Sequence, residues 1–454
     1  MDFPREDSPY WNEAVETMPY EKVRELQLTK VKRQVNYNYD NSIFYRRKFD
    51  QAGIKPEDIK SWKDFTSIPL MNKEEQRKAQ TESLERFGNP YGIITCAPLN
   101  KIIRISSTSG TTGTPTLYTL TKNDTKIITE LHARKNWRMG LKPGHVVLHA
   151  LALSMFTGGV PVIDAMQEYG LCVVPVGAEA KTRKILEFIE LTKPYALKCT
   201  PSLAEHMIEQ APKIIGKEVG DLGIKLVSCG GEPGVGIPAV KKRIEEAYGA
   251  KLYDNIGGAH TFHGISCRDG VYRGMHLVSP DYCVLELVDP ETKSPIEITD
   301  GAIGEMVFTF LDWEGGPFLR YDLGDMLQVF TKPCECGWPD IRFKIIGRAD
   351  DMLIVKGVNI YPMAIKNFVA SFMPRTTGAV RILLDKPGHR VTPPLKLKVE
   401  YDQAVSESEL PLLKKEMEQL MSDIHRIRSD ITFVPPYSLE RESHKTKLIE
   451  VVSS

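Results

Sequence analysis

The stretch SSTSGTTGTPTLYTL, residues 106–120, gathers small hydroxylated residues, two glycines and a proline in one short run. Apolar segments bracket the run, because KIIRI (residues 101–105) precedes it and LYTL closes it. A flexible linker of this composition would not be flanked by strand-like segments. Glycine lets backbone N–H groups approach a ligand closely, and hydroxyl groups add hydrogen-bond donors. We therefore predict two strands joined by a loop that wraps phosphate oxygens.

The phosphate-binding loop of P-loop enzymes does not explain this run. That motif places a Lys directly after its second Gly, whereas Gly113 is followed by Thr114 and Pro115. The glycine-rich loop of protein kinases is also absent from the sequence. A GTPase or a kinase is therefore disfavoured, and the alternative is a Ser/Thr-rich surface turn.

The composition of the 454-residue chain is that of an ordinary globular protein, with 42% hydrophobic and 26% charged residues. Lys plus Arg and Asp plus Glu both number 59, so no net charge attracts nucleic acid or an anionic membrane. The N-terminal MDFPREDSPYW does not have the basic start and apolar run of an export signal. The most apolar stretch, residues 146–166, is interrupted by polar and helix-breaking residues. We predict a cytoplasmic protein that binds neither nucleic acid nor membrane.

The order of apolar segments predicts the fold class. Between Gly144 and Asp289, short apolar runs alternate with amphipathic stretches, which is typical of an α/β domain whose mostly parallel sheets are covered by helices. In the last hundred residues, strand-like segments at 378–385 and 395–403 precede an amphipathic helix. That helix is predicted from apolar residues spaced three and four apart: Leu410, Leu413, Met417, Leu420 and Ile424. We predict a large N-terminal domain, residues 1–348, and a small α+β C-terminal domain, residues 349–454.

Five segments, in chain order, resemble motifs of the adenylate-forming superfamily of acyl-CoA synthetases, particularly its phenylacetate-CoA ligase-like branch. SSTSGTTGTPT resembles the phosphate loop, and VSCGGEP (227–233) resembles the adenine-side loop. KLYDNIGG (251–258) lies where the family has an aromatic-containing loop, and RYDLGDM (320–326) resembles the ribose-binding motif. IIGRADDMLIVKGVNIYP (345–362) resembles the hinge that begins a mobile C-terminal lid domain.

This resemblance implies an enzyme that joins a carboxylic acid to ATP, releases pyrophosphate, and transfers the acyl group to coenzyme A with release of AMP. It implies Mg²⁺ with the ATP. Asp325 is expected to accept hydrogen bonds from the ribose, and Arg348 to place positive charge near the sugar and phosphates. The residues assigned to the nucleotide are Ser107, Thr108, Ser109, Gly110, Thr111, Thr112, Gly113, Gly231, Glu232, Pro233, Tyr253, Asp254, Asp325 and Arg348.

Two further residues receive roles from the resemblance. ERESHKTKLIEV (440–451) is similar to the family segment whose Lys contacts the forming adenylate, which makes Lys445 the catalytic candidate and Lys447 the alternative. His444 stands where the family usually has Gly. Asp350 occupies the hinge position, about which the small domain would turn between its adenylating and thioester-forming poses.

The sequence departs from the family at the loop that helps hold Mg²⁺. YDNIG places Gly257 where the family has an acidic residue, and Asp254 where Gly is common. In one alternative, Mg²⁺ is held by phosphates, water and a different side chain, either Asp254 or Glu232. In the other, the loop is rebuilt for an unusual substrate. Two other activities stay open: an adenylyl transferase that leaves AMP on an acidic acceptor, and a nucleotide-binding relative without turnover.

The segment ALSMFTGG, residues 152–159, corresponds to the acyl-pocket lining of the family. Phe156 with Gly158 and Gly159 would suit a flat aromatic ring. A second polar or anionic group on that ring could meet three histidines: His149, His260 and His263. These residues predict an aromatic acid with an extra carboxylate or hydroxyl group.

Three cysteines and one histidine could form a structural zinc site, because Cys₃His is a common tetrahedral ligand set. These residues are Cys267, His276, Cys334 and Cys336. The other cysteines are expected to be buried small residues without disulfides: Cys96, Cys172, Cys199, Cys229 and Cys283. A homodimer is a further expectation, based on how common dimers are.

Overall fold

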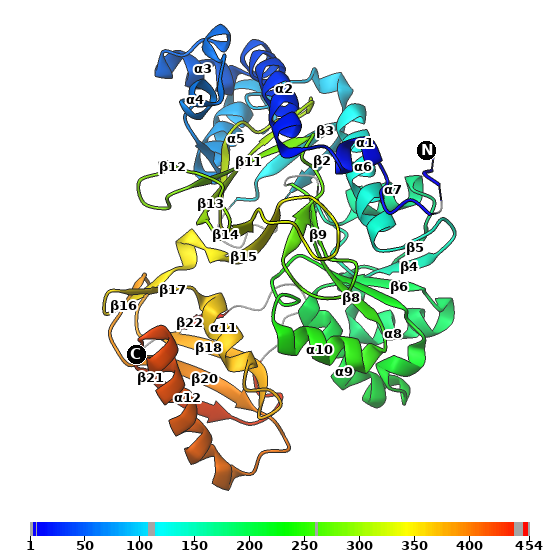
Figure 1. The fold of residues 1–454 in the computed structure, drawn as a ribbon, viewed down its shortest axis with the longest axis vertical. Helices are drawn as coiled ribbons and strands as arrows, with labels where there is room; N and C mark the ends of the chain where they lie inside the picture. The colour runs from blue at the N-terminus through cyan, green and yellow to red at the C-terminus, as the bar shows by residue number, and fades with distance from the viewer. Residues whose placement is uncertain (1–2, 6, 108–113, 259–261, 440–447, 453–454) are drawn as a thin grey trace.

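The computed structural model describes residues 3–5, 7–107, 114–258, 262–439 and 448–452 of the chain. Figure 1 shows a large body built from the blue to yellow part of the chain and a smaller orange to red unit beside it. Among the described residues, none of the helices combines the length and the apolar character that crossing a lipid bilayer requires. The mixed α/β architecture confirms the predicted fold class.

A parallel sheet forms the green half of the large body, and its strands pair in the order β5-β4-β6-β7-β8 (Figure 1). The helices between these strands confirm the predicted β-α-β alternation. The elements are β4 (Val146–His149), α7 (Val160–Glu168), β5 (Cys172–Pro175), α8 (Lys181–Thr192), β6 (Ala196–Cys199), α9 (Pro201–Ile215), β7 (Leu226–Cys229), α10 (Pro238–Tyr248) and β8 (Lys251–Ile256). Helix α9 begins where the Thr200 side chain accepts a hydrogen bond from the Leu203 N–H, with Pro201 in the first turn.

The same sheet continues with strands that pair in antiparallel fashion, which the alternation up to Asp289 did not predict. The connections between these strands contain no crossover helix within the described residues, so neighbouring strands run in opposite directions. These strands are β9 (Gly264–Ser266), β10 (Met275–Leu277), β11 (Cys283–Val288), β12 (Pro295–Ile296), β13 (Ile303–Phe310), β14 (Tyr321–Phe330) and β15 (Arg342–Arg348).

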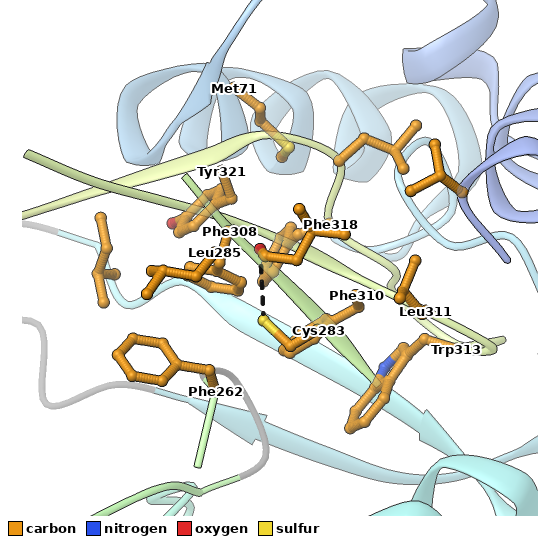
Figure 2. Close-up of a cluster of buried hydrophobic side chains, with 14 of the residues drawn as sticks. Met71, Phe262, Cys283, Leu285, Phe308, Phe310, Leu311, Trp313, Phe318 and Tyr321 are labelled. Atoms are coloured by element: carbon orange, nitrogen blue, oxygen red, sulfur yellow. Dashed lines mark hydrogen bonds between the residues drawn. The ribbon is translucent and has the colours of Figure 1, made fainter. Parts of the chain in front are cut away.

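The antiparallel strands pack on N-terminal elements through an aromatic core (Figure 2). Tyr321 of β14 stacks on Phe318 with ring centroids 4.1 Å apart, and its ring lies 5.6 Å from that of Phe308. Burial of such large rings supplies much of the stabilisation of a core. The packed N-terminal elements are α2 (Tyr20–Asn41), α3 (Ile43–Ala52), α4 (Trp62–Thr66), β1 (Met71–Asn72), α5 (Lys73–Phe87) and α6 (Lys122–Arg138). The short helix α1 (Glu13–Glu16) lies outside this core and is joined to α6 by the Glu16–Arg138 ion pair.

The two strands predicted around the hydroxyl-rich loop are present. β2 (Ile102–Ser107) and β3 (Leu117–Thr121) pair in antiparallel fashion, with Ser107 opposite Leu117. The Thr121 side chain then accepts hydrogen bonds from the first turn of α6. Residues 108–113, between the strands, lie outside the described ranges.

The C-terminal unit has its own core, in which α12 packs on a four-stranded sheet ordered β21-β20-β18-β22. The predicted strands and helix are present. The buried helix residues are Leu413, Met417 and Met421, whereas Ile424, one of the apolar residues from which the helix was predicted, is 62% exposed. The elements are β16 (Leu353–Val355), β17 (Val358–Ile360), α11 (Pro362–Ala370), β18 (Thr376–Leu384), β19 (Arg390–Val391), β20 (Leu395–Tyr401), α12 (Leu410–His425), β21 (Ser429–Val434) and β22 (Ile449–Val451).

Candidate active site

The turn after β7, which resembles the adenine-side loop, is held tightly between β8 and α9. Gly231 has a left-handed φ of +87°, and a Cβ at Gly230 would lie 2.6 Å from the carbonyl oxygen of Asn255. The Glu232 carboxylate accepts a hydrogen bond of 2.8 Å from the Ser202 N–H at the start of α9. Pro233 follows on the exposed side of the turn. Glu232 therefore stabilises the turn by binding a helix N-terminus.

Tyr253 and Asp254 are both buried in β8. The Asp254 carboxylate accepts a hydrogen bond of 3.1 Å from the hydroxyl of Tyr272. Burial raises the pKa of Asp254 to about 7. The carboxylate therefore already has a partner, and a metal ion at this position would have to compete with Tyr272.

Gly257 departs from the family pattern for a steric reason. Its φ is +131°, and a Cβ built there would lie 2.6 Å from the imidazole ring of His263. A Glu at this position would collide with that ring and would also need a backbone conformation that only Gly adopts readily. The buried His263 ring therefore excludes the acidic side chain that the family has here.

Asp325, Arg348 and Asp350 come together where the sheet meets the C-terminal unit. Asp325 of β14 lies opposite Arg348 of β15, and the Arg348 Nη1 donates to an Asp325 oxygen at 3.0 Å. The Arg348 Nε and Nη2 donate to Asp350 at 2.7 and 2.9 Å. These carboxylates raise the pKa of Arg348, although its partial burial alone would lower it. The predicted ribose ligand and hinge residue thus share one guanidinium.

The start of the hydroxyl-rich loop lies beside the predicted acyl segment. Ser107 is buried, its N–H donates to the Met155 carbonyl at 2.7 Å, and it forms a parallel bridge with Phe156. A Cβ at Gly159 would lie 2.4 Å from the Leu153 carbonyl oxygen, whereas Gly158 faces open space. The close backbone packing at Gly159 therefore folds this segment onto itself, and the hydrogen bond and bridge at Ser107 fix it against β2.

Several predicted site residues cannot be placed, because they lie outside the described ranges: Thr108, Ser109, Gly110, Thr111, Thr112, Gly113, His260 and Lys445. His149 and His263 are described, and both are almost completely buried. His263 Nε2 lies 3.1 Å from the Gly258 carbonyl oxygen. Burial lowers the pKa of His149 to about 3.

Sequence reasoning missed two lysines beside these histidines. Lys198 lies in β6 directly opposite His149 of β4, and Lys135 of α6 donates to the Ile256 carbonyl at 3.2 Å. The sequence does mark Lys198 as unusual. It is a charged residue inside the buried strand ALKC, and buried parallel strands normally carry apolar residues.

The four residues predicted to bind zinc converge, and all four ligand atoms lie within 4.8 Å of one another. The Cys267 Sγ lies 3.4 Å from His276 Nε2 and 3.5 Å from the Cys334 Sγ. The Cys336 Sγ lies 3.3 Å from His276 Nε2. Zinc–ligand bonds of about 2.0–2.3 Å in a tetrahedron separate neighbouring donors by roughly 3.5 Å, so the arrangement fits a zinc ion.

A buried carboxylate lies behind the histidine of this set. Asp340 Oδ2 lies 3.7 Å from His276 Nδ1 and accepts a hydrogen bond of 2.7 Å from Arg138. Arg138 also donates to the buried Glu16 at 2.7 Å. The 3.7 Å separation is too long for a hydrogen bond, and among the described residues His276 Nδ1 has no hydrogen-bond partner. A carboxylate that came closer would orient this histidine, as carboxylates next to metal-binding histidines do. Of the remaining cysteines, Cys172 is exposed, so its predicted burial was wrong, because it begins the outermost strand β5.

Comparison with known families matches residues 47–309 to "AMP-binding enzyme" and residues 357–450 to "AMP-binding enzyme C-terminal domain". Among curated proteins, the phenylacetate-coenzyme A ligase of Thermus thermophilus is 31% identical over 93% of this chain and 94% of its own length. The corresponding ligase of Escherichia coli K12 is 28% identical over 92% of this chain and 90% of its own length.

Two crystal structures of 2-hydroxyisobutyryl-CoA ligase differ in their similarity to this chain. The ligase in the postadenylation state with 2-HIB-AMP superposes with a TM-score of 0.89, at 28% identity, covering 100% of this chain and 94% of the other. The ligase with 2-HIB-AMP and CoA in the thioesterification state gives 0.71, at the same identity, covering 99% and 94%. The arrangement of this chain is therefore closer to the first state.

Proposed function

We propose that this chain, which belongs to the family of AMP-binding enzymes and to its phenylacetate-CoA ligase-like branch, activates an aromatic carboxylic acid with ATP and transfers the acyl group to coenzyme A. The observation that carries the proposal is the similarity over nearly the whole chain to ligases that form acyl-CoA. The relatives support AMP-forming acyl-CoA ligation as the general reaction of this chain, without specifying the acid. The aromatic nature of the acid is the finer part of the proposal.

The chemistry requires donors around the phosphates, because a carboxylate attacks a polyanion and charge develops on the leaving pyrophosphate. The loop that begins at Ser107 supplies backbone and hydroxyl donors. Asp325 accepts from the ribose hydroxyls, and Arg348, already ion-paired to Asp325, holds that carboxylate in place. Lys445 contacts the forming adenylate. Phe156, Gly158 and Gly159 line the ring of the acid, beside the start of the phosphate loop.

ATP brings Mg²⁺ to such a site. Glu232 and Asp254, the side chains considered as ligands, are engaged by Ser202 and Tyr272. We therefore propose that phosphate oxygens and water supply most of the ligands, as is usual for Mg²⁺ at nucleotide sites. The ion would neutralise phosphate charge during the transfer.

We propose a structural Zn²⁺ at Cys267, His276, Cys334 and Cys336. Three thiolates and one imidazole fill a tetrahedron, so no position is left for water or substrate. The ligands lie at the end of β9, in β10 and in the connection between β14 and β15. The ion would fasten the antiparallel part of the sheet and would take no part in acyl transfer.

The proposed function is tested by measuring AMP and pyrophosphate release with ATP, Mg²⁺ and CoA against benzoates, phenylacetates and benzene dicarboxylates. CoA-dependent AMP formation with an aromatic acid is expected. Pyrophosphate release without CoA-dependent AMP would instead indicate the adenylyl transferase. ATP binding without any turnover would indicate the non-catalytic relative, which the absence of an acidic residue at Gly257 favours.

Asp350→Pro should separate the two half-reactions. Proline fixes φ near −65°, so the short turn Ala349–Asp351 could no longer absorb the rotation of the small domain. We expect pyrophosphate release from acid and ATP to stay within a few-fold of the unmodified enzyme, while thioester formation falls about 100-fold. Single-turnover assays of each half-reaction measure this, and the spared adenylation serves as the control. Retained thioester formation would remove Asp350 from the hinge.

A further inference from the structure

Five basic side chains meet in the interior of the large body, and we call them the buried basic cluster: His132, Lys135, His149, Lys198 and His263. His149 and Lys198 are direct cross-strand partners on β4 and β6. The His132 and His263 rings contact edge to face, with centroids 5.1 Å apart. The charge of Lys198 acts on each of the other four groups. Two elements of the sheet, one helix and the segment after β8 thus converge on one point.

The cluster is removed from solvent and has no counter-charge. Lys198 is 6% exposed, and the other four side chains are at most 1% exposed. In the part of the chain that the structure describes, no carboxylate forms an ion pair with Lys135 or Lys198. Lys135 donates to a backbone carbonyl, and the Lys198 Nζ lies 3.4 Å from Asn255 Oδ1. Burial lowers the pKa of Lys198 to about 8 and that of Lys135 well below its usual value.

Several other buried cations of this chain have carboxylate partners, although Arg342 bonds only to backbone carbonyls. Arg134, adjacent to Lys135 in sequence, pairs with Asp281 at 2.7 Å, and Lys241 pairs with Glu245. Unpaired buried charge is costly and therefore rare. The exception at Lys135 and Lys198 indicates that their partner is supplied from outside the described chain.

The histidines of the cluster are also incompletely satisfied. Among the described residues, neither ring nitrogen of His149 has a hydrogen-bond partner, and the same holds for His132 Nε2 and His263 Nδ1. Buried polar atoms in folded proteins are almost always hydrogen-bonded, so each exception calls for an explanation. Imidazole N–H groups without a partner, next to amines without a counter-charge, are suited to donate hydrogen bonds to the oxygens of an anion.

The cluster also lies at the edge of the parallel sheet where such folds bind their ligands. His149 ends β4, and Lys198 is the last residue but one of β6, so both are at the carboxyl ends of parallel strands, where ligands bind in such sheets. The acyl segment 152–159 follows His149 closely in the chain. Gly258, which contacts His263, approaches this segment so closely that a Cβ there would lie 2.9 Å from the Thr157 carbonyl oxygen.

We propose that the buried basic cluster receives a second carboxylate of the acid, so that the substrate is a dicarboxylate of which one carboxylate is activated and the other is held by Lys135, Lys198 and the adjacent imidazoles. This inference rests on the proposed function. It favours a carboxylate over a hydroxyl group, because a hydroxyl would leave both amines without a counter-charge. Burial lowers the pKa of Lys135 well below its usual value, so a carboxylate bound beside this amine favours its protonated form, and the protein takes up a proton as the substrate binds.

The decisive comparison is between benzene dicarboxylates and their monomethyl esters, which keep the ring and one carboxylate but replace the second charge with a neutral group one methyl larger. For the preferred isomer, kcat/KM from pyrophosphate release should exceed that of its monoester by about 30-fold or more. Lys135→Met and Lys198→Met should reduce this ratio toward one. Equal use of diacid and monoester by the unmodified enzyme, or an unchanged ratio in both variants, would overturn the inference and leave the proposed function intact.

Calorimetric titration with the same diacid, in two buffers of different ionisation enthalpy and without ATP, separates the inference from the proposed function. Binding with proton uptake is expected, and it should be lost in both variants. If the diacid binds in this way but no pyrophosphate forms, the proposed function fails while the inference stands. If monoacids are turned over but the diacid neither binds nor reacts, the inference fails alone. Absence of binding and of turnover with every acid contradicts both.

Thermal unfolding shows whether a variant loses its preference for the diacid because it no longer folds. Methionine has a volume similar to that of lysine and carries no charge, so Lys135→Met and Lys198→Met should keep or raise Tm in the absence of substrate. Lys241→Met is the matched control, because it removes a buried lysine whose carboxylate partner, Glu245, then keeps only the hydrogen bond from the Leu252 N–H and has no counter-charge. It should lower Tm. Unfolding of both cluster variants would assign the two amines a structural role and overturn the inference.

Discussion

Lys445→Ala is expected to lower the rate of pyrophosphate release from acid and ATP by at least about 100-fold, because the charge that develops on the transferring phosphate loses a preorganised cationic donor. The same variant should still consume a chemically prepared acyl-adenylate with CoA at a rate within a few-fold of the unmodified enzyme. In the proposed two-pose cycle, this second half-reaction takes place with the small domain in its other pose, where the lysine would no longer meet the phosphate. Separate single-turnover assays of the two half-reactions measure the difference.

Lys447→Ala is the matched comparison, since Lys447 lies two residues further along the same segment. If Lys447→Ala, rather than Lys445→Ala, loses adenylation, the catalytic lysine is Lys447, and His444 does not occupy the position of the family glycine. Equal loss of both half-reactions in Lys445→Ala would contradict a role confined to adenylation. It would point instead to a lysine needed for the fold of the C-terminal unit.

The sequence predicted the parallel half of the sheet well because each strand and helix carries its own periodic pattern. KTRKILEFIELT and SLAEHMIEQ became α8 and α9 where they were expected. The antiparallel continuation through β9 and β10 was not predicted, because these strands have three residues each. Such short segments show too little periodicity to indicate a direction of pairing.

The candidate site was predictable where its residues belong to a motif or to a familiar ligand set. Arg348 and Asp350 share one motif and Asp325 belongs to another, and the structure adds the hydrogen bonds that join Arg348 to both carboxylates. The pairing of Lys198 with His149 depends on the register of β6 against β4, and no local pattern specifies that register. The steric exclusion of a side chain at Gly257 by His263 is likewise a contact between residues six positions apart, which only the folded chain reveals.

Arg138, Asp340 and His276 illustrate the same limit. The zinc ligands were assembled from residue type alone, because three cysteines and a histidine are a familiar ligand set. The carboxylate behind His276 was not predicted, since Asp340 is an ordinary residue in the sequence and gains its meaning from Arg138 and Glu16, more than a hundred residues away. Second-layer residues around a metal ligand have no motif of their own.

Replacement of a zinc ligand should cause the largest loss of stability. The purified protein is expected to carry about one Zn²⁺ per chain, measured by elemental analysis. Cys334→Ser should remove most of the metal and lower the free energy of unfolding by about 4 kcal/mol or more, as expected when a structural metal is lost. Cys172→Ser is the matched control, because Cys172 is exposed and distant in sequence from the four ligands. It should keep both metal and stability.

Asp340→Asn tests whether the carboxylate behind His276 acts through the metal. It should weaken zinc binding by about 10- to 100-fold in competition with a chelator, while the four ligands stay in place. A purely structural role for Asp340, through its bond to Arg138, would instead lower Tm without changing zinc affinity. If the unmodified protein holds no zinc, and Cys334→Ser is as stable as Cys172→Ser, the four side chains pack as thiols and imidazole. The connection between β14 and β15 would then be held to β9 and β10 by those contacts alone.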